Sequence, residues 1–189
     1  MLEELVLKNR SYRKFHEDIA INMESLRTLV NLARLTASAA NRQPLKYILS
    51  CDRSRNTLIF PCLAWAGYLP HWPGPSPGER PSAYIILLGD TEIHRSFDFD
   101  AGIAAQTILL GATERNLGGC IIASIDRNKL REILNIEARY EILLAIALGK
   151  PKETVLIEKM GSGGDVKYWR DSAGVHHVPK RSLEEIILS

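Results

Sequence analysis

Two arginines near the N-terminus stand three residues apart, with a hydroxyl group between them. Arg10, Ser11 and Arg13 lie in a polar segment, where two guanidinium groups could converge on a phosphate or on the polar edge of a heterocycle. The alternative is a solvated loop in which these arginines form ion pairs with Glu17 and Asp18. Taken alone, the segment favours the solvated loop.

A second polar cluster lies just before Pro44 and consists of Ser38, Ala39, Asn41 and Gln43. Small side chains would let a flat ligand approach the backbone, while the amides could form hydrogen bonds with its hydroxyl groups. The alternative is an ordinary helix C-terminus with polar capping. The proline disfavours helix at the residue before it, so a helix boundary is expected here.

A glycine-rich stretch over residues 117–124 is the third candidate. Glycines permit close packing, and backbone N–H groups beyond the strand, near Ile122 and Ala123, could face a ring. A plain entry into a strand explains the same residues equally well.

The fourth candidate is the basic pair Lys180 and Arg181, which precedes a capping box at Ser182 and Glu185. Basic side chains beside a helix N-terminus can form an anion site, because the free N–H groups and the helix dipole add to their charge. A surface charge pair is the more frequent explanation of such a dipeptide.

Metal binding and the commonest nucleotide motifs are not expected. Cys51, Cys62 and Cys120 form no CxxC pair, and no histidines show an HExxH spacing. His176 and His177 are adjacent, so in an extended segment they point to opposite faces. Walker A and GxGxxG loops are absent. A phosphorylated ligand would therefore depend on arginines and lysines.

The composition is that of one globular domain spanning residues 1–189. The chain has a mass of 21.2 kDa, with 46% apolar and 24% charged residues. The net charge is only +2, so basic and acidic residues nearly balance, and nucleic acid is not expected as the main partner. Apolar runs such as 142–148 are far shorter than the roughly 20 residues that span a membrane, and the acidic N-terminus lacks an export signal. We therefore expect a cytoplasmic protein without a membrane partner.

Periodicity and capping residues predict an α+β fold with a mixed central sheet flanked by helices. The helix at 98–116 is apolar nearly all round, so it is expected to be buried in the core or against another subunit. The proline-rich 67–81 segment is expected to be a surface loop that acts as a lid, and 161–189 a C-terminal extension. Helices are expected at 2–8, after Asn22, at 98–116, after Asp126 and after Ser182, and strands at 45–51, 56–60, 83–88, 119–124 and 140–148.

Taken in this order from Leu5 to Ile187, the motifs resemble those of the nitroreductase family of FMN-dependent flavoproteins. The resemblance implies a nitroreductase-like α+β fold and an intertwined homodimer with two FMN sites at its interface. The chain departs from the family pattern at Ala37 and Leu45, where the family often has Pro and Trp. It also has Asn116-Leu117-Gly118 where the family has Gly-Leu-Gly.

The resemblance also implies a role for each candidate residue. Arg10, Ser11 and Arg13 match the segment that holds the phosphate, ribityl chain and pyrimidine edge, and Arg13 would act electrostatically near flavin N1 and the C2 carbonyl. Ile122 and Ala123 would present backbone groups to N5 and the C4 carbonyl. The remaining implied FMN contacts are Ser38, Ala39, Asn41 and Gln43, commonly across the subunit interface, and Lys180 and Arg181 at the phosphate.

The function implied is transfer of hydride from NAD(P)H to flavin N5, followed by passage of electrons to a nitroaromatic, quinone or similar small acceptor. No side-chain acid or base is assigned. The alternatives are a flavin-binding protein without turnover, and an enzyme of the same fold that fragments flavin or dehalogenates reductively. A cofactor-free interaction domain would require the motifs to be coincidental.

Overall fold

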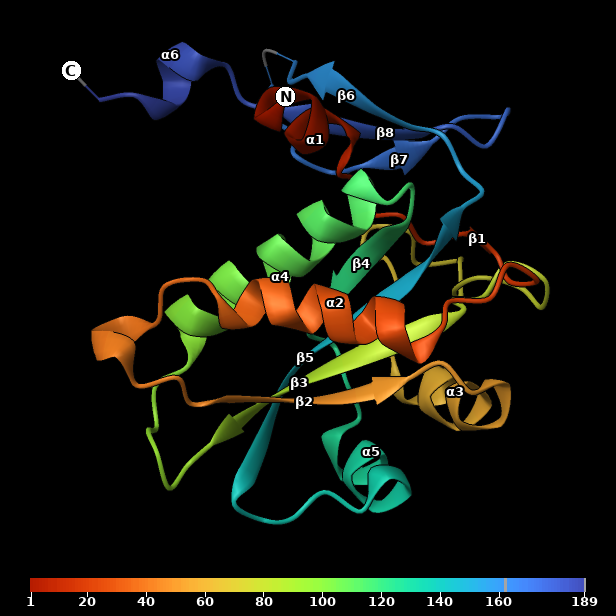
Figure 1. Ribbon diagram of the computed structural model, residues 1–189. Helices are drawn as coiled ribbons and strands as arrows, with labels where there is room; N and C mark the ends of the chain where they lie inside the picture. The colour runs from red at the N-terminus through yellow and green to blue at the C-terminus, as the bar shows by residue number, and fades with distance from the viewer. Residues whose placement is uncertain (162, 189) are drawn as a thin grey trace.

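The central sheet of the protein is built on one long strand. A computed structural model describes residues 1–161 and 163–188 (Figure 1). In it β5 (Tyr140–Pro151) pairs with β3 along one edge and with β4 and β1 along the other, and β2 pairs with the far edge of β3. All these ladders are antiparallel, and Ser11 adds a parallel bridge to Gly119. The other strands of this sheet are β1 (Phe15–His16), β2 (Leu45–Ser50), β3 (Ala83–Asp90) and β4 (Gly118–Ile122).

Helices cover both faces of this sheet, so β3 is buried along its whole length (Figure 1). Its alternate residues point to opposite faces. Ile85 and Leu87 pack with the residues of α2 (Met23–Arg34) and α4 (Asp98–Glu114). Tyr84 and Ile86 pack with those of α3 (Arg53–Ile59) and α5 (Arg127–Leu134). The α+β class with a helix-flanked sheet is confirmed.

Capping residues begin the helices where the sequence predicts. The side chain of Asn22 accepts a hydrogen bond from the Ser25 N–H at 2.8 Å, and Asp126 accepts one from Lys129 at 3.1 Å. The predicted capping box at Ser182 opens α6 (Leu183–Ile186). The first helix, α1, spans Leu2–Lys8 as expected.

The predicted strand at 56–60 is wrong, because these residues form most of α3. Asp52 caps the helix by accepting a hydrogen bond from the Arg55 N–H at 2.9 Å. Only Asn56 and Ile59 of the helix are buried, at the three-residue spacing of one helical face. Asn56 is held in the core by hydrogen bonds to Ser50 and to the Ser82 carbonyl. A short 3₁₀ helix, η2 (Phe60–Cys62), follows α3. Another, η1 (Ala39–Asn41), precedes β2.

The C-terminal extension forms a second, smaller sheet in the order β6-β8-β7. Its strands are β6 (Val155–Lys159), β7 (Trp169–Arg170) and β8 (His176–Lys180). Glu153 joins this sheet to the main one, since its carboxylate pairs with Arg170 at 2.8 Å. That carboxylate also accepts hydrogen bonds from the backbone N–H groups of Arg13 and Lys14.

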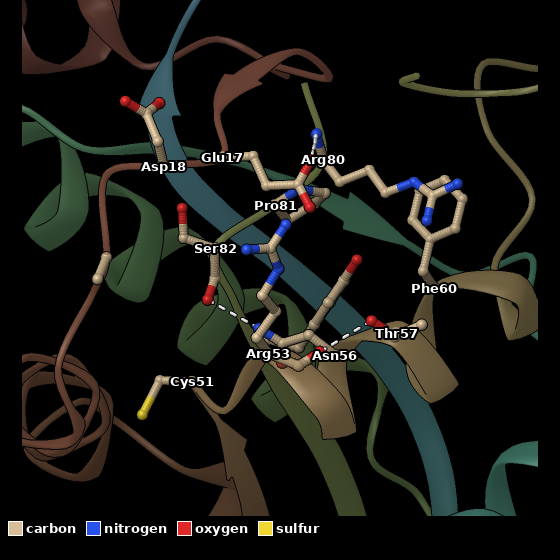
Figure 2. Close-up of a pocket in the computed structure, with 12 residues that line it drawn as sticks. Glu17, Asp18, Cys51, Arg53, Asn56, Thr57, Phe60, Arg80, Pro81 and Ser82 are labelled. Carbon is tan, nitrogen blue, oxygen red and sulfur yellow. Dashed lines mark hydrogen bonds between the residues drawn. The ribbon is translucent and has the colours of Figure 1, made fainter. Parts of the chain in front are cut away.

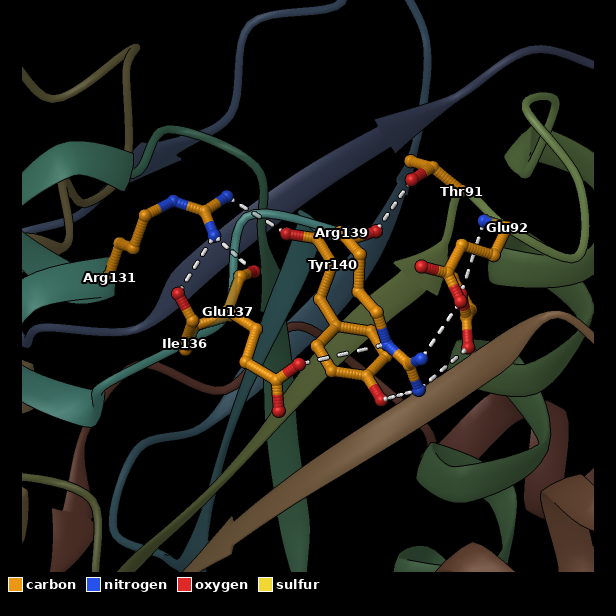
Figure 3. A network of polar contacts seen from close by, with 8 residues as sticks. Thr91, Glu92, Arg131, Ile136, Glu137, Arg139 and Tyr140 are labelled. Carbon is orange, nitrogen blue, oxygen red and sulfur yellow. Dashed lines mark hydrogen bonds and ion pairs between the residues drawn. The ribbon is translucent and has the colours of Figure 1, made fainter.

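A polar network holds the connection between α5 and β5 (Figure 3). Arg131 donates to the carbonyl groups of Ile136, Glu137 and Tyr140 at 3.1, 2.7 and 2.8 Å. Next to it, Arg139 lies 2.9 Å from Glu92. These bonds satisfy carbonyl groups in the segment that leads from α5 into β5.

Close packing at Gly119 yields a first prediction. A Cβ atom there would lie 2.5 Å from the Ala147 carbonyl oxygen and 2.7 Å from the Leu109 side chain, and the backbone carbonyl cannot move aside. We expect Gly119→Ala to lower the free energy of unfolding by about 1–3 kcal/mol. Urea denaturation measures this. Gly67→Ala is the control, because a Cβ at Gly67 meets nothing within 4 Å. Equal stability of the two variants would contradict the packing.

A candidate ligand site at the outer edge of strand β4

A cavity of about 170 Å³ lies beside β4 and draws on four separated parts of the chain. Arg13 enters it from the N-terminal segment and Tyr168 from the C-terminal extension. Residues 64–67 and 120–124 supply the remaining walls, and most of them are small. The structure thus brings Arg13, Ile122 and Ala123 to the lining of one cavity.

The outer edge of β4 presents backbone groups to this cavity. The Gly119 carbonyl accepts a hydrogen bond from the Tyr12 N–H at 3.0 Å, so this residue faces away from β5. Because backbone groups alternate between the two edges of a strand, those of Ile121 also face outward. Ala123 follows the strand, and its carbonyl accepts a hydrogen bond from Arg127 at 3.3 Å. Ile122 pairs with β5, and its side chain is buried in the core.

Arg13 keeps an uncompensated positive charge. Its guanidinium donates to the Ser11 carbonyl and contacts His176 Nε2, both at 3.2 Å, and it lies 4.9 Å from the centre of the Tyr168 ring. None of the ion pairs among the described residues involves this guanidinium. Burial and, to a smaller extent, the charges of Arg13, Arg170 and His177 together lower the pKa of His176 from 6.5 to about 4. The imidazole is therefore neutral and can accept the hydrogen bond.

The C-terminal extension and the proline-rich loop meet beside the cavity. The rings of Tyr68 and Tyr168 lie 5.0 Å apart, and the Tyr168 hydroxyl accepts a hydrogen bond from the Tyr68 N–H at 3.3 Å. Further along, the Arg170 guanidinium lies 4.2 Å from the centre of the Trp72 ring. The loop expected to be a lid is thus attached to the extension, with Trp72 packed against the core rather than free on the surface.

The second polar cluster predicted from the sequence, Ser38, Ala39, Asn41 and Gln43, lies in another part of the structure. Ser38 and Gln43 line a different cavity beside Asp100, at the N-terminal end of α4, while Ala39 and Asn41 are exposed. The β4 cavity follows the other end of α4, and 17 helical residues span about 25 Å. Within one copy of the chain, the second polar cluster therefore does not reach the β4 cavity.

Asp100 holds the second motif in shape, although sequence reasoning did not identify it. Its carboxylate accepts hydrogen bonds from Ser38 Oγ at 2.5 Å and from the Ala39 N–H at 2.9 Å. Ser38 Oγ in turn accepts one from the Gln43 N–H at 2.9 Å. These bonds support a loop in which Asn41 and Gln43 both have a φ of 53°. An acidic residue in the first turn of a helix was the only local signal.

The basic residues are not joined by direct contacts. Arg10 donates to the Val6 carbonyl at 2.5 Å, at the end of α1, and shares no bonded partner with Arg13. Lys180 ends β8, and Arg181 is exposed and lies 3.7 Å from Glu185.

Across residues 1–161 and 163–188, no group of three or more His, Cys, Asp or Glu side chains is placed to hold a metal ion. No helix in the same part of the chain is long and apolar enough to cross a membrane.

Comparison with solved structures defines the class of protein. The fold matches a nitroreductase family protein from Streptococcus pneumoniae TIGR4 with a TM-score of 0.69 and 21% identity, covering 100% of both chains. It also matches an FMN-dependent nitroreductase from Clostridium difficile R20291 with a TM-score of 0.64 and 25% identity, over 83% of this chain and 91% of the other. The chain therefore has the nitroreductase fold.

Sequence comparison agrees. The model of the nitroreductase family matches residues 75–150. A protein of Archaeoglobus fulgidus that carries the name NADH dehydrogenase/NAD(P)H nitroreductase is 25% identical over 158 residues, which cover 79% of this chain and 85% of the relative. The resemblance to the nitroreductase family is confirmed.

The role of Asp100 can be tested by removing its charge. Asp100→Asn keeps the size of a side chain that is 5% exposed but turns one acceptor oxygen into a donor facing Ser38 or Ala39. We expect it to lower the free energy of unfolding by about 1–3 kcal/mol, measured by urea denaturation. Asp98→Asn is the matched control, since Asp98 is exposed in the same helical turn. If both variants are equally stable, the carboxylate does not hold the loop.

The adjacent histidines predict opposite effects of pH on stability. Because the folded-state pKa of His176 lies below 6.5, the unfolded chain takes up a proton first, and stability falls as the pH is lowered from 6.5 to 4. Hydrogen bonds to Glu158 and Asp171 raise the pKa of His177, so this residue adds stability below pH 6.5 that is lost as the pH rises through the folded-state pKa.

Thermal unfolding between pH 4 and 7.5 separates the contributions of His176 and His177 to stability. His176→Gln should reduce the loss of stability on acidification, and His177→Gln should increase it. The same pH profile in both variants would show that the burial of His176 does not control its protonation.

Proposed function

We propose that the protein is an FMN-dependent oxidoreductase that takes hydride from NAD(P)H and passes electrons to a nitroaromatic, quinone or similar small acceptor. The observation that carries this proposal is the Arg13 guanidinium, which has no carboxylate partner among the described residues and lines a cavity with outward-facing backbone groups. The names of the Archaeoglobus fulgidus and Clostridium difficile relatives support the same activity.

The residues of the β4 cavity fit a flat heterocycle. Ala64, Ala66 and Ala123 are small enough to let a ring lie against the backbone. The indole N–H of Trp65, which also lines the cavity, is buried and has no hydrogen-bond partner in the described part of the chain. Carbonyl and N–H groups at the outer edge of β4 would supply both kinds of partner that the polar edge of flavin needs.

When bound, FMN supplies a ring that accepts hydride at N5. In this chain Arg13 would place positive charge beside N1 and the C2 carbonyl, where negative charge develops on reduction. Its partner His176 is neutral, so it orients the guanidinium without cancelling the charge as a carboxylate would. Arg10, Lys180 and Arg181, with Ser11 nearby, are the proposed partners of the phosphate and ribityl groups.

A second copy of the chain would complete the site. A cavity of about 170 Å³ is smaller than the roughly 300–1,000 Å³ of sites for larger ligands, so part of a flavin would remain uncovered. Phe99 and Ile103 of α4 are 79% and 40% exposed, and Ile121 beside the cavity is 37% exposed. We propose that a homodimer covers these residues and brings the Ser38–Gln43 loop of one copy to the cavity of the other.

The visible absorption spectrum of the purified protein tests the proposal first. Flavin bands, and a mass of FMN for the chromophore released by heat, are expected. Mixing with NADH or NADPH under nitrogen should then bleach the flavin, whereas a binding protein without turnover would stay yellow. A colourless protein that also fails to bind added FMN would overturn the proposal.

Arg13→Gln tests the residue on which the proposal depends. Hydrogen bonds to charged groups contribute about 1.5–3 kcal/mol, so we expect FMN affinity to fall roughly tenfold to a hundredfold. Reduction by NAD(P)H should also slow, because the charge on the reduced ring loses its partner. Fluorescence titration with FMN and stopped-flow absorbance measure the two effects.

Lys14→Gln is the control, since Lys14 lies next in the chain but pairs with Glu79 at 3.4 Å. If Arg13→Gln behaves like this control in both measurements, Arg13 does not contact the flavin.

A further inference from the structure

A second cavity, of about 200 Å³, lies at the opposite end of β2 from the Ser38–Gln43 loop (Figure 2). Its walls come from α3, from the segment that leads into β3 and from the residues that follow β1. Phe60 lines it and lies 5.7 Å, between ring centres, from Trp65 of the β4 cavity. The two cavities are therefore neighbours with separate linings.

Two buried hydroxyl groups in this cavity have no hydrogen-bond partner among residues 1–161 and 163–188. Tyr84 is 1% exposed and Ser82 is 9% exposed, and both line the cavity. The two residues are two positions apart on one extended segment, so their side chains point to the same face. Leaving such a group without a partner costs about 1–3 kcal/mol, which indicates that the cavity holds a hydrogen-bonding occupant.

Two guanidinium groups line the same cavity, and neither forms an ion pair with a described residue. Figure 2 shows Arg53 reaching from α3 toward Pro81, and Arg80 lying across the ring of Phe60. The Arg80 guanidinium is 4.2 Å from the centre of that ring, and its Nε atom is buried without an acceptor. Guanidinium groups match the oxygens of carboxylates and phosphates.

Two acidic residues also line the cavity, and their charges are placed differently. Glu17 accepts hydrogen bonds from the backbone N–H groups of Gly78 at 2.5 Å and Arg80 at 3.4 Å, which partly neutralise it. Asp18 is exposed to solvent. Burial raises the pKa of Tyr84, so its phenol stays protonated and able to donate. The groups left without partners are therefore donors.

We propose that this cavity binds a small oxyanion, a carboxylate or a phosphate, held by Arg53 and Arg80 with hydrogen bonds from Ser82 and Tyr84. Its volume is below the roughly 300–1,000 Å³ of sites for larger ligands, which favours a small acid over a nucleotide. The site is distinct from the proposed FMN site.

Calorimetric titration of the FMN-supplemented protein with sodium phosphate and, separately, sodium succinate tests the proposal, with chloride holding the ionic strength constant. We expect saturable binding of at least one of the two anions. The anion that saturates shows whether the cavity takes a phosphate or a carboxylate. Arg53→Gln should weaken binding at least tenfold. Tyr84→Phe, which removes only the hydroxyl group, should weaken it several-fold.

Arg55→Gln is the matched control, because Arg55 lies in the same helix but does not line the cavity. Binding that survives equally in Arg53→Gln and Arg55→Gln belongs to another site and overturns the proposal, as does the absence of saturable binding by either anion. Circular dichroism shows whether each variant is folded. If Arg53→Gln unfolds, Ser82→Ala and Tyr84→Phe decide the question.

The outcome is independent of the flavin. A protein that takes up no FMN would fail the spectral test in the preceding subsection, yet the difference between Arg53→Gln and Arg55→Gln could still be measured on it.

Discussion

The pairing of β5 on both of its edges is the constraint on which the rest of the structure depends. The strand meets β3 along one edge and β4 and β1 along the other, and residues 145–148 are fully buried. A shift of one residue would turn every side chain to the opposite face, so the register is strongly determined. As a result β4 is an outer strand, and its free edge beyond Gly119 borders the cavity that Arg13 and Tyr168 also line.

The carboxylate of Glu153 connects the end of β5 to the N-terminal segment and to the C-terminal extension. Glu153 is the second residue after β5, and its side chain in the ion pair with Arg170 is 2% exposed. It also accepts hydrogen bonds from the backbone of Arg13 and Lys14, which lie about 140 positions away in the sequence. Because Glu153 is occupied by these partners, the Arg13 guanidinium turns to the neutral His176 and keeps its charge.

Local signals in the sequence predicted much of the fold. The capping side chains of Asn22, Asp126 and Ser182 begin helices where expected, because a cap depends only on residues within one turn. The long apolar runs of β3 and β5 are buried strands for an equally local reason. The strand predicted at 56–60 was wrong, because its apolar pattern fits a helix as well as a strand. The N-cap at Asp52 favours the helix.

The sequence by itself therefore determined the class of the fold, most element boundaries and the motifs that indicate the nitroreductase family. Only the tertiary structure decided how those motifs are arranged: Arg13 meets Ala123, while Ser38 lies at the other end of α4. It also revealed that Asp100 holds Ser38 across 62 positions and that Tyr84 carries a buried hydroxyl without a partner. The physical reason is that caps and periodicity act over a few residues, whereas these contacts depend on strand register and helix packing.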